Sequence, residues 1–331
     1  MKNIFKILEK EYIEKIFKEK KNFYFPSLKN AKITSLEIKK ESPDWVKESC
    51  LASYKLIFSN GSKKNIWSTA KIGESKEKAF QILSYLYSNG FNKGFFQVQR
   101  PLDFIKEINA FFYEKAEGVP LNLILEKRKP STKLFKKISE FLFKIHSLKF
   151  KKFKPKMLKL KDYEECFREL KNLVPQFHQL IPSLKKIIFL EKLREGNYFI
   201  HGDFYPSNII VGKNKLFLID FDKAGRGNFL IDLLSFYFWF DLPKIKPLKL
   251  SLNETEDYKN EFLENYCKLS HLNLKEVKSQ LEKFKAKIFL DCLHYVTFRA
   301  CRGWKKIDEK LRGRFTESIK ILLEKINEIL S

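Results

Sequence analysis

The segment that most constrains the fold of this chain reads NYFIHGDFYPSNIIV and runs from Asn197 to Val211. Apolar residues at both of its ends predict two short buried strands, and the residues between them predict a tight loop, so the segment has a hairpin-like pattern. The loop carries one carboxylate, Asp203, and one amide, Asn208. An acid and an amide on a loop between buried strands indicate a candidate site for chemistry.

A second carboxylate, Asp220, follows the apolar strand pattern LFLI further along the chain. Two carboxylates and an amide in this order suit metal-dependent phosphoryl transfer. One acid can orient an attacking hydroxyl, while Mg²⁺ takes oxygen ligands beside the phosphates. Each of the three residues alone would be interpreted as a turn former or a cap. All three together, with apolar strands around them, favour a functional site.

The wider pattern predicts a small strand-rich part followed by a larger, mainly helical part. An amphipathic helix is expected over residues 2–20, and strands with one helix over residues 31–116. A turn at Asn60-Gly61 predicts a hairpin within this part. Further helices are predicted over residues 131–149, 161–172, 182–195, 229–240, 254–268, 273–300 and 306–328. We therefore expect an α+β chain with one domain over residues 1–116 and a second over residues 117–331.

The charge of the chain bears on its partners. The 331 residues include 65 Lys and Arg but 40 Asp and Glu, a formal net charge of +25, and the lysines are spread over every segment. Such a charge raises the affinity for anions in general, including nucleic acid and acidic membrane surfaces. The even spread indicates an ordinary lysine-rich surface instead. Binding to nucleic acid is therefore not expected, while a peripheral contact with an anionic surface stays open.

Cysteine and histidine spacing bears on metal sites and on the compartment. The five cysteines lie far apart without C-x-x-C spacing, which indicates neither a disulfide framework nor a zinc site and favours a cytoplasmic location. The histidines outside the loop have no ligand spacing and are expected to be structural: His146, His178, His271 and His294. The N-terminal segment lacks the apolar core of a signal peptide, and the longest apolar run, residues 229–240, is too short for a membrane span.

The motifs FIHGDFYPSNIIV and LIDFDKAGRGNFLIDLLSF resemble those of the aminoglycoside phosphotransferase and choline kinase family. The resemblance implies a two-lobed, protein-kinase-like fold with ATP and Mg²⁺ as cofactors. It implies that Asp203 is the catalytic aspartate, and that Asn208 and Asp220 hold Mg²⁺. It also implies that Asp232 is a buried acid that braces the catalytic loop, and that His201 helps to shape this loop.

The resemblance extends upstream to the nucleotide side. The segment STAKIGESKEKAF resembles the family's third strand, whose lysine contacts the ATP phosphates, and this implies that role for Lys71. The helix that follows would supply a glutamate partner, for which Glu77 fits better than Glu74. The segment LDFIKEINAFFYEKAEGVPL resembles the entry to the hinge, where backbone groups near Tyr113 and Glu114 would meet adenine.

Two features depart from the family's pattern. The segment KKESPDWVKESC, between the first two predicted strands, has no glycine-rich phosphate loop, so serine and backbone amides would replace it. No cluster of acids marks a pocket for a polycation, and the acids of NETEDYKNEFLENY are interpreted as a solvated helix face. With the net charge, this favours an anionic acceptor, such as a sugar phosphate, a nucleoside or a glycolipid head group, over an aminoglycoside.

Three functions stay open at this point. The first is an ATP- and Mg²⁺-dependent kinase that phosphorylates a hydroxyl of a small molecule. The second is a catalytically idle kinase-like module that binds a partner or an anionic surface, and the third is a basic nucleic-acid-binding protein. The set of Asp203, Asn208 and Asp220 favours the first over the second. The absence of a nucleic-acid-binding motif counts against the third.

Overall fold

The chain divides into two compact units. The computed structural model describes residues 3–43, 48–72, 75–150, 152–155, 160–173, 182, 184, 185, 196–243, 248–303 and 309–330. The first unit comprises Met1–Gly118 with Ile210–Asp222, and the second comprises Val119–Ile209 with Lys223–Ser331. The division between residues 116 and 117 that the sequence suggests stays a prediction.

A five-stranded antiparallel sheet forms the larger part of the first unit. Its strands lie in the order β1 (Ile33–Lys40), β2 (Ser49–Phe58), β3 (Lys63–Lys71), β6 (Ala110–Glu114) and β5 (Pro101–Ile105). The predicted hairpin at Asn60-Gly61 joins β2 to β3, and Gly61 has a φ of +80°, which glycine adopts without strain. The strands expected from the sequence around this turn are confirmed.

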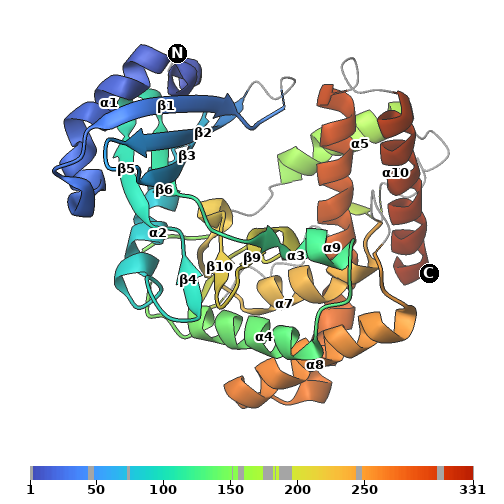
Figure 1. Ribbon diagram of the computed structural model, residues 1–331. Helices are drawn as coiled ribbons and strands as arrows, with labels where there is room; N and C mark the ends of the chain where they lie inside the picture. The colour runs from blue at the N-terminus through green and yellow to red at the C-terminus, as the bar shows by residue number, and fades with distance from the viewer. Residues whose placement is uncertain are drawn as a thin grey trace. The chain divides into compact units, whose positions relative to one another are not determined.

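One face of this sheet is covered by η1 (Ile4–Leu8) and α1 (Lys10–Tyr24), as Figure 1 shows. Alternate side chains of β2 are buried on this face, namely Cys50, Ala52, Tyr54, Leu56 and Phe58. Phe17 of α1 makes edge-on ring contacts with Tyr54 and Phe112, with ring centroids 5.4 and 6.1 Å apart. Each aromatic pair of this kind contributes about 0.5–1.5 kcal/mol beyond the area it buries. The N-terminal helices are therefore part of the core of this unit.

The expectation of a single helix over residues 2–20 is wrong. A 3-10 helix ends at Leu8, the backbone of Glu9 is extended, and the α-helix then runs on to Tyr24. The buried Tyr54 hydroxyl donates a hydrogen bond to the carbonyl oxygen of Ile7 at 2.7 Å. In a continuous helix this carbonyl would instead accept from the next turn. The sheet thus imposes a break that the helical periodicity does not reveal.

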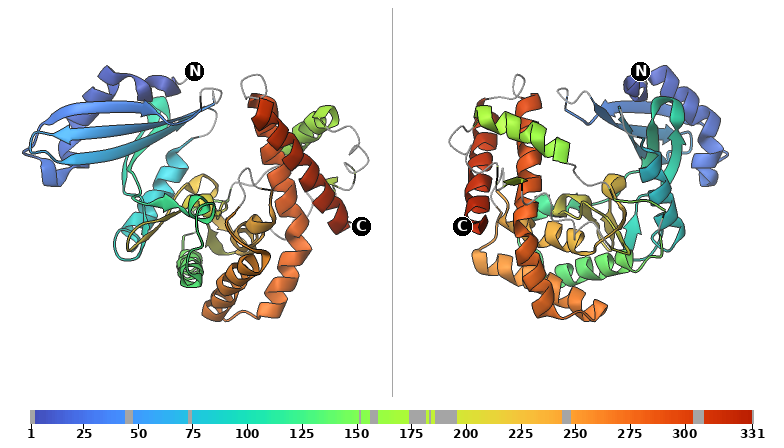
Figure 2. Two further views of the ribbon diagram at one scale, coloured as in Figure 1. Left: turned by 45° about the vertical axis from the view of Figure 1, so that its right-hand side comes forward. Right: turned by 180° about the vertical axis from the view of Figure 1, so that it is seen from behind.

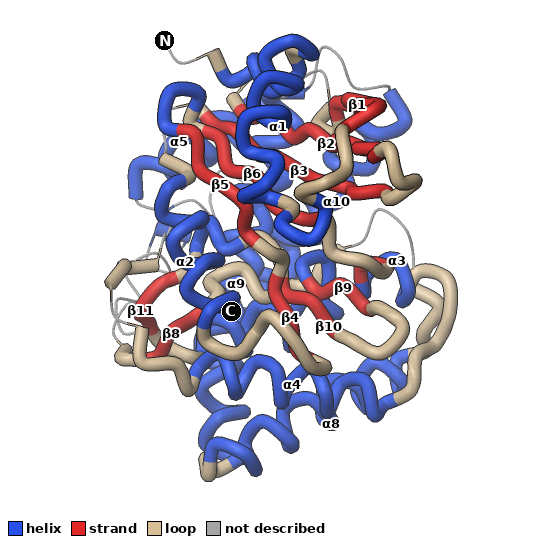
Figure 3. Tube along the Cα trace, turned by 60° about the vertical axis from the view of Figure 1, so that its left-hand side comes forward, coloured by secondary structure: helices blue, strands red, loops and turns tan. Residues whose placement is uncertain are grey.

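A smaller set of strands in the first unit leads to the second predicted carboxylate. The strand β10 (Leu216–Leu218) pairs in parallel with β4 (Phe96–Val98), and β9 (Ile209–Val211) lies on the other side of β10 (Figure 3). The helix α2 (Glu77–Ser88) packs against β4 and β5. All three side chains of β10 are buried, so the strand has a fixed position in the sheet. The position of Asp220, two residues after the strand, follows from it.

The second unit is mainly helical. Its elements include β7 (Val119–Pro120), α3 (Leu121–Leu125), α4 (Thr132–His146), α5 (Leu160–Leu173), β8 (Tyr198–Ile200), β11 (Gly225–Gly227), α7 (Leu230–Tyr237), η8 (Phe238–Asp241), α8 (Leu252–Ser270), α9 (Leu274–Gly303) and α10 (Glu309–Leu330). The helices α5, α9 and α10 lie side by side (Figure 2), and α4 packs on α8. The helix predictions are confirmed here, except that the one over residues 182–195 lies almost wholly outside the described residues.

The hairpin-like interpretation of residues 197–211 is wrong. The strand β8 pairs antiparallel with β11, whereas β9 pairs with β10 in a different sheet. The two short buried strands exist as expected, but each takes a partner from a later part of the chain. The loop between them therefore links two sheets, and its backbone must be held by contacts other than a hairpin ladder.

The described part of the chain contains no helix long and apolar enough to cross a membrane.

Candidate active site

The loop between β8 and β9 is closed by its own side chains. The backbone N–H of Asp203 donates to Nδ1 of His201 at 3.2 Å, and the Asn208 side-chain amide donates to the carbonyl oxygen of Asp203 at 2.9 Å. Oδ1 of Asn208 accepts no hydrogen bond from the described residues. One amide group therefore fixes the loop with its nitrogen and leaves its oxygen for a ligand.

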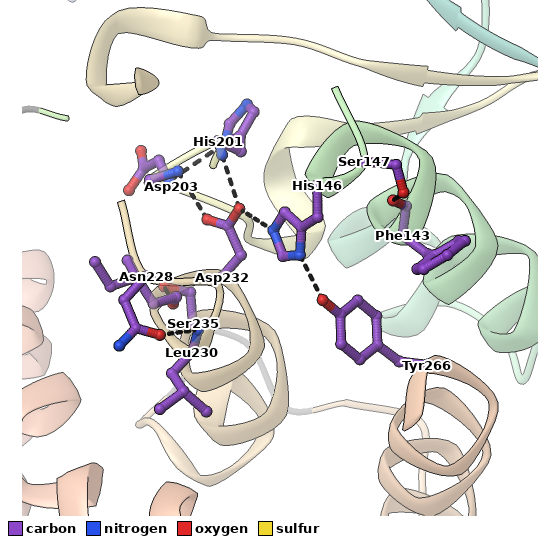
Figure 4. Close-up of polar contacts among 12 residues, drawn as sticks. Phe143, His146, Ser147, His201, Asp203, Asn228, Leu230, Asp232, Ser235 and Tyr266 are labelled. Carbon is purple, nitrogen blue, oxygen red and sulfur yellow. Dashed lines mark hydrogen bonds and ion pairs between the residues drawn. The ribbon is translucent and has the colours of Figure 1, made fainter. Parts of the chain in front are cut away.

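Below this loop lies a buried carboxylate, Asp232 of α7, which is 0% exposed. Its Oδ2 accepts from the backbone N–H of His201 at 2.7 Å, and its Oδ1 accepts from the N–H of Gly202 at 2.7 Å (Figure 4). Hydrogen bonds from backbone N–H groups to a carboxylate are stronger than neutral ones. The predicted brace by Asp232 is confirmed, and so is the structural role of the buried His201.

His146, which the sequence predicts to be structural, also contacts the carboxylate of Asp232. Nε2 of His146 lies 3.0 Å from Oδ2 of Asp232, and its Nδ1 lies 2.7 Å from the Tyr266 hydroxyl. Because a carboxylate only accepts hydrogen bonds, Nε2 carries the proton. Burial, and next the nearby charges of Tyr198 and Asp232, raise the pKa of Tyr266, so its hydroxyl stays protonated. The place of His146 at the end of the apolar face of α4 is a sequence signal for burial, but it does not indicate which residue the ring meets.

Gly202 is required by close packing within the second unit. Its φ is +76°, and a Cβ added there would lie 2.7 Å from the carbonyl oxygen of Lys223. No L-residue fits such a space without backbone movement. The loop that carries Asp203 and the backbone at Lys223 therefore lie in direct contact.

Asp203 itself is partly exposed and has one ion-pair partner. Oδ1 of Asp203 accepts from Nζ of Lys223 at 2.7 Å, with the two side chains 20% and 45% exposed respectively. Oδ2 accepts no hydrogen bond from any residue that the structure describes. The contact with Lys223 is not among those that the sequence predicts.

In the first unit, Asp220 follows β10 with an exposed side chain and a φ of +65°. Two residues later, Asp222 forms an ion pair with Lys76, which directly precedes α2 and is 7% exposed. Asn109 ties the same region together: its Oδ1 accepts from the N–H of Lys76 at 2.9 Å, and its Nδ2 donates to the carbonyl oxygen of Lys71 at 2.6 Å. The start of α2, the end of β3 and the turn after β10 are thus linked.

Lys71 and Tyr113, two of the residues predicted to meet the nucleotide, share one face of the large sheet. Trp67 of β3 pairs with Tyr113 of β6, so Lys71, four positions along β3, points to the same side. This is the face opposite to the one that η1 and α1 cover. Burial, followed by the charges of Asp220 and Asp222, raises the pKa of Tyr113. The sheet face and the turn after β10 therefore lie close together within this unit.

Glu77 and Glu114 both have partners of their own. Glu77 is exposed, and its carboxylate accepts from Nε2 of Gln81 at 3.1 Å, while Glu74 lies outside the described residues. Glu114 forms ion pairs with Arg100 at 3.1 Å and Lys64 at 3.6 Å, and its backbone N–H donates to the carbonyl oxygen of Arg100. The backbone N–H of Lys115 likewise donates to the carbonyl oxygen of Asn65 at 3.0 Å, so a backbone donor toward a ligand would come from a residue after Lys115.

Each unit carries one side chain of a kind that Mg²⁺ accepts as a ligand. Asn208 offers an amide oxygen and Asp220 an exposed carboxylate, which are the hard oxygen ligands that Mg²⁺ prefers. Across the residues described, no group of three or more His, Cys, Asp or Glu side chains gathers as a metal site of its own. Mg²⁺ usually takes one or two protein carboxylates and completes its shell with water and substrate phosphates.

Several solved structures share the fold of this chain. A choline kinase from Cryptosporidium parvum Iowa II is 14% identical with a TM-score of 0.64, covering 96% of this chain and 94% of that one. The amicoumacin kinase hAmiN, solved with AMP-PNP, Ca²⁺ and Ami, is 15% identical with a TM-score of 0.58, covering 96% and 95%. A thermostable mutant of the aminoglycoside phosphotransferase APH(4)-Ia, solved with AMP-PNP and hygromycin B, is 13% identical with a TM-score of 0.52, covering 94% and 97%.

These similarities confirm the kinase-like α+β fold expected from the sequence. A search of curated protein sequences finds no match to the chain. The sequence pattern of the phosphotransferase enzyme family (APH) matches residues 70–264, more than half of the chain, and this range includes the loop of Asp203, the turn of Asp220 and the brace of Asp232. The chain therefore belongs to the phosphotransferase enzyme family.

Proposed function

We propose that this phosphotransferase is an ATP- and Mg²⁺-dependent kinase that transfers the γ-phosphate to a hydroxyl of a small molecule. The observation that carries the proposal is the state of Asp203. Its loop is fixed from below by Asp232 and within by Asn208, while its Oδ2 accepts nothing from the described residues. A rigid carboxylate with one open oxygen suits the orientation of an acceptor hydroxyl.

The proposed reaction gives each residue a distinct task. The acceptor oxygen forms a bond to the γ phosphorus while the bond from that phosphorus to the β–γ bridging oxygen breaks, and the electron pair leaves with ADP. Asp203 accepts the hydroxyl proton and later releases it to solvent. Mg²⁺, when bound, neutralises phosphate charge, and Asn208 and Asp220 would hold it. Lys71 would contact the phosphates.

The remaining nucleotide contacts stay proposals. Backbone groups near Tyr113 and Glu114 would meet adenine, and Glu77 is the proposed acidic partner on α2 for Lys71. In relatives of the same fold, AMP-PNP is present beside amicoumacin kinase and APH(4)-Ia, which supports the use of a nucleotide here. A cytoplasmic location, inferred from the cysteines, is proposed with it.

The charge of the second unit supports an acceptor that is not a polycation. Acids on or near α8 are matched by lysines: Glu254 with Lys129 at 2.6 Å, Glu261 with Lys136 at 3.0 Å, and both Glu256 and Asp241 with Lys259 at 2.7 and 3.3 Å. The hydrogen bonds from Lys129 and Ser251 lower the pKa of Glu254 to about 2. Since these acids already have cations beside them, we propose a neutral or anionic acceptor, such as a sugar phosphate, a nucleoside or a glycolipid head group.

Transfer from labelled ATP to a pooled panel of metabolites, with products separated by mass, tests the proposal. Asp203→Asn should lose transfer while it keeps ATP binding. The matched control is Asp257→Asn, which changes the same group at an exposed position of α8. Labelled product with wild-type protein and the control, but not with Asp203→Asn, supports the kinase. ATP binding without transfer to any acceptor would favour the alternative, a catalytically idle kinase-like binding module.

A further inference from the structure

Lys223 contacts the loop of Asp203 in two ways, through its side-chain ammonium and through its backbone. Nζ of Lys223 donates to Oδ1 of Asp203 at 2.7 Å. The backbone and the Cβ of Lys223 pack against Gly202, where an added Cβ would lie 2.7 Å from the Lys223 carbonyl oxygen and 3.1 Å from its Cβ. Because Gly202 has no side chain, the backbone of Lys223 can lie directly against the loop. From there, the Lys223 side chain reaches the carboxylate of Asp203, the next residue of the loop.

The ion pair between Lys223 and Asp203 contributes little to the folding stability of the protein. The Lys223 side chain is 45% exposed, and ion pairs with so much solvent around them contribute little to folding, because water already solvates both charges. Exposed lysines also pair with surface acids elsewhere, as Lys18 does with Glu14 and Lys39 with Glu41. Lys223 differs because its partner is the carboxylate proposed to act on the acceptor.

The two oxygens of Asp203 are used differently. Oδ1 accepts from Lys223, whereas Oδ2 accepts no hydrogen bond from the described residues. A charge-assisted hydrogen bond at 2.7 Å restricts rotation of the carboxylate about its terminal bond. The carboxylate thus has one anchored oxygen and one oxygen in a defined direction.

We propose that Lys223 is a positioning residue for the transfer reaction: it anchors Oδ1 of Asp203 so that Oδ2 faces the acceptor hydroxyl. The proposal rests on the proposed kinase function. Lys223 lies three residues after Asp220, and the same short segment, IDFDK, therefore supplies both the proposed metal ligand and the anchor of the catalytic carboxylate. A misdirected carboxylate lowers turnover without changing the affinity for the nucleotide, because positioning acts on the reacting geometry.

The first experiment compares Lys223→Met, Lys223→Arg and the control Lys213→Met, which removes one exposed lysine from the turn before β10. For Lys223→Met we expect kcat to fall about 10- to 100-fold, since small errors in position cost up to that much, while the KM for ATP changes less than about twofold. Lys223→Arg should recover most of kcat, and Lys213→Met should equal the wild type. An unchanged kcat in Lys223→Met would overturn the proposal, because the lysine would then be dispensable for transfer. A higher kcat would also overturn it, because the lysine would then hinder the action of Asp203.

The second experiment asks whether Lys223 acts through Asp203. In an Asp203→Asn background, the small residual rate of transfer is measured at high enzyme concentration and long incubation, and Lys223→Met should not lower this residual rate further, because the carboxylate it positions is gone. A further loss as large as in the wild-type background would mean that Lys223 acts independently and would contradict the proposal. With Lys223→Ala, ethylammonium should restore transfer more than tetramethylammonium does at equal ionic strength, since the latter cannot donate a hydrogen bond. Equal effects of the two cations would also count against it.

The two hypotheses fail in different ways. Wild-type protein that transfers no phosphate to any acceptor overturns the kinase function, and the positioning role falls with it. Wild-type transfer combined with insensitivity to Lys223→Met overturns the positioning role alone. Thermal unfolding of each variant, with and without ATP and Mg²⁺, checks that the loss of transfer does not come from loss of the fold.

Discussion

Nε2 of His146 lies 3.0 Å from Oδ2 of Asp232, and both side chains are sealed from solvent. The same carboxylate accepts two backbone N–H groups of the loop that carries Asp203. Because these groups are buried, removal of this one carboxylate would leave three donors around it without their partner. The loop is therefore fixed by a residue on α7 and, through His146, by α4.

Replacing Asp232 by Asn should destabilise the protein and reduce transfer. An amide has one acceptor oxygen in place of two, and its NH₂ group would face backbone donors, so at least one buried donor loses its partner. We expect a loss of about 2–4 kcal/mol in the free energy of unfolding, measured with urea. The exposed Asp257→Asn serves as control. A midpoint equal to that of the wild type would show that the loop does not need this carboxylate.

The Lys76–Asp222 pair should matter more for stability than a surface pair does. Lys76 is 7% exposed, so Lys76→Met leaves the carboxylate of Asp222 partly buried without its cation. We expect a loss of about 1–3 kcal/mol in the free energy of unfolding. Lys18→Met removes an exposed pair with Glu14 at 3.3 Å and should cost about 0.5 kcal/mol or less. Equal effects of the two variants in urea unfolding would contradict this prediction.

Thermal stabilisation should need ATP and Mg²⁺ together. A ligand that binds only the folded state stabilises it by about 2.7 kcal/mol at a hundredfold excess over its Kd. Asp220→Ala should erase most of the Mg²⁺-dependent part, and Lys71→Ala should weaken the nucleotide part. Asp203→Ala should keep both. The proposed roles of these residues would be contradicted by the opposite result. In that case, Asp203→Ala would lose the stabilisation by ATP, and Asp220→Ala would keep the Mg²⁺-dependent stabilisation.

His294 on α9 should make the protein less stable in mild acid. Burial lowers the pKa of His294 below the ordinary value of a histidine, the charge of Lys223 adds to this, and the carboxylates of Asp291, Asp162 and Glu165 oppose it. Below about pH 6.5 the unfolded chain therefore binds a proton that the folded protein binds only at lower pH, so stability falls as the pH drops.

The slope from one such group is at most about 1.4 kcal/mol per pH unit. Urea unfolding at several values between pH 5 and pH 7.5 measures it. His294→Gln should flatten the curve, whereas His271→Asn, at an exposed position after α8, should leave it unchanged. An unchanged slope in His294→Gln would assign the acid sensitivity to other groups.

The parts of the site that lie close together in the sequence could be predicted from it. The residues from His201 to Asn208 form one loop, so their spacing alone determines their geometry. The brace by Asp232 was predictable because a charge inside an apolar helix needs a buried role. The kinase-like fold followed from the order of strands and helices together with these motifs.

The parts that depend on distant residues could not be predicted. His146 meets Asp232 across 86 positions, and Lys76 meets Asp222 across 146. In a chain with so many lysines, nothing in the local pattern distinguishes Lys76 from its neighbours. The pairing of β8 with β11, in place of a hairpin with β9, likewise depends on which distant strand packs beside it.

Asp220 adopts a left-handed backbone with a φ of +65°, a conformation that costs most L-residues about 1–2 kcal/mol and that glycine adopts freely. Asp220→Gly should therefore make the folded protein more heat-resistant while it removes the carboxylate proposed to hold Mg²⁺. In a library selected only for survival at high temperature, glycine would be enriched at this position and active clones would be lost. Selection for retained activity would be needed to keep the aspartate.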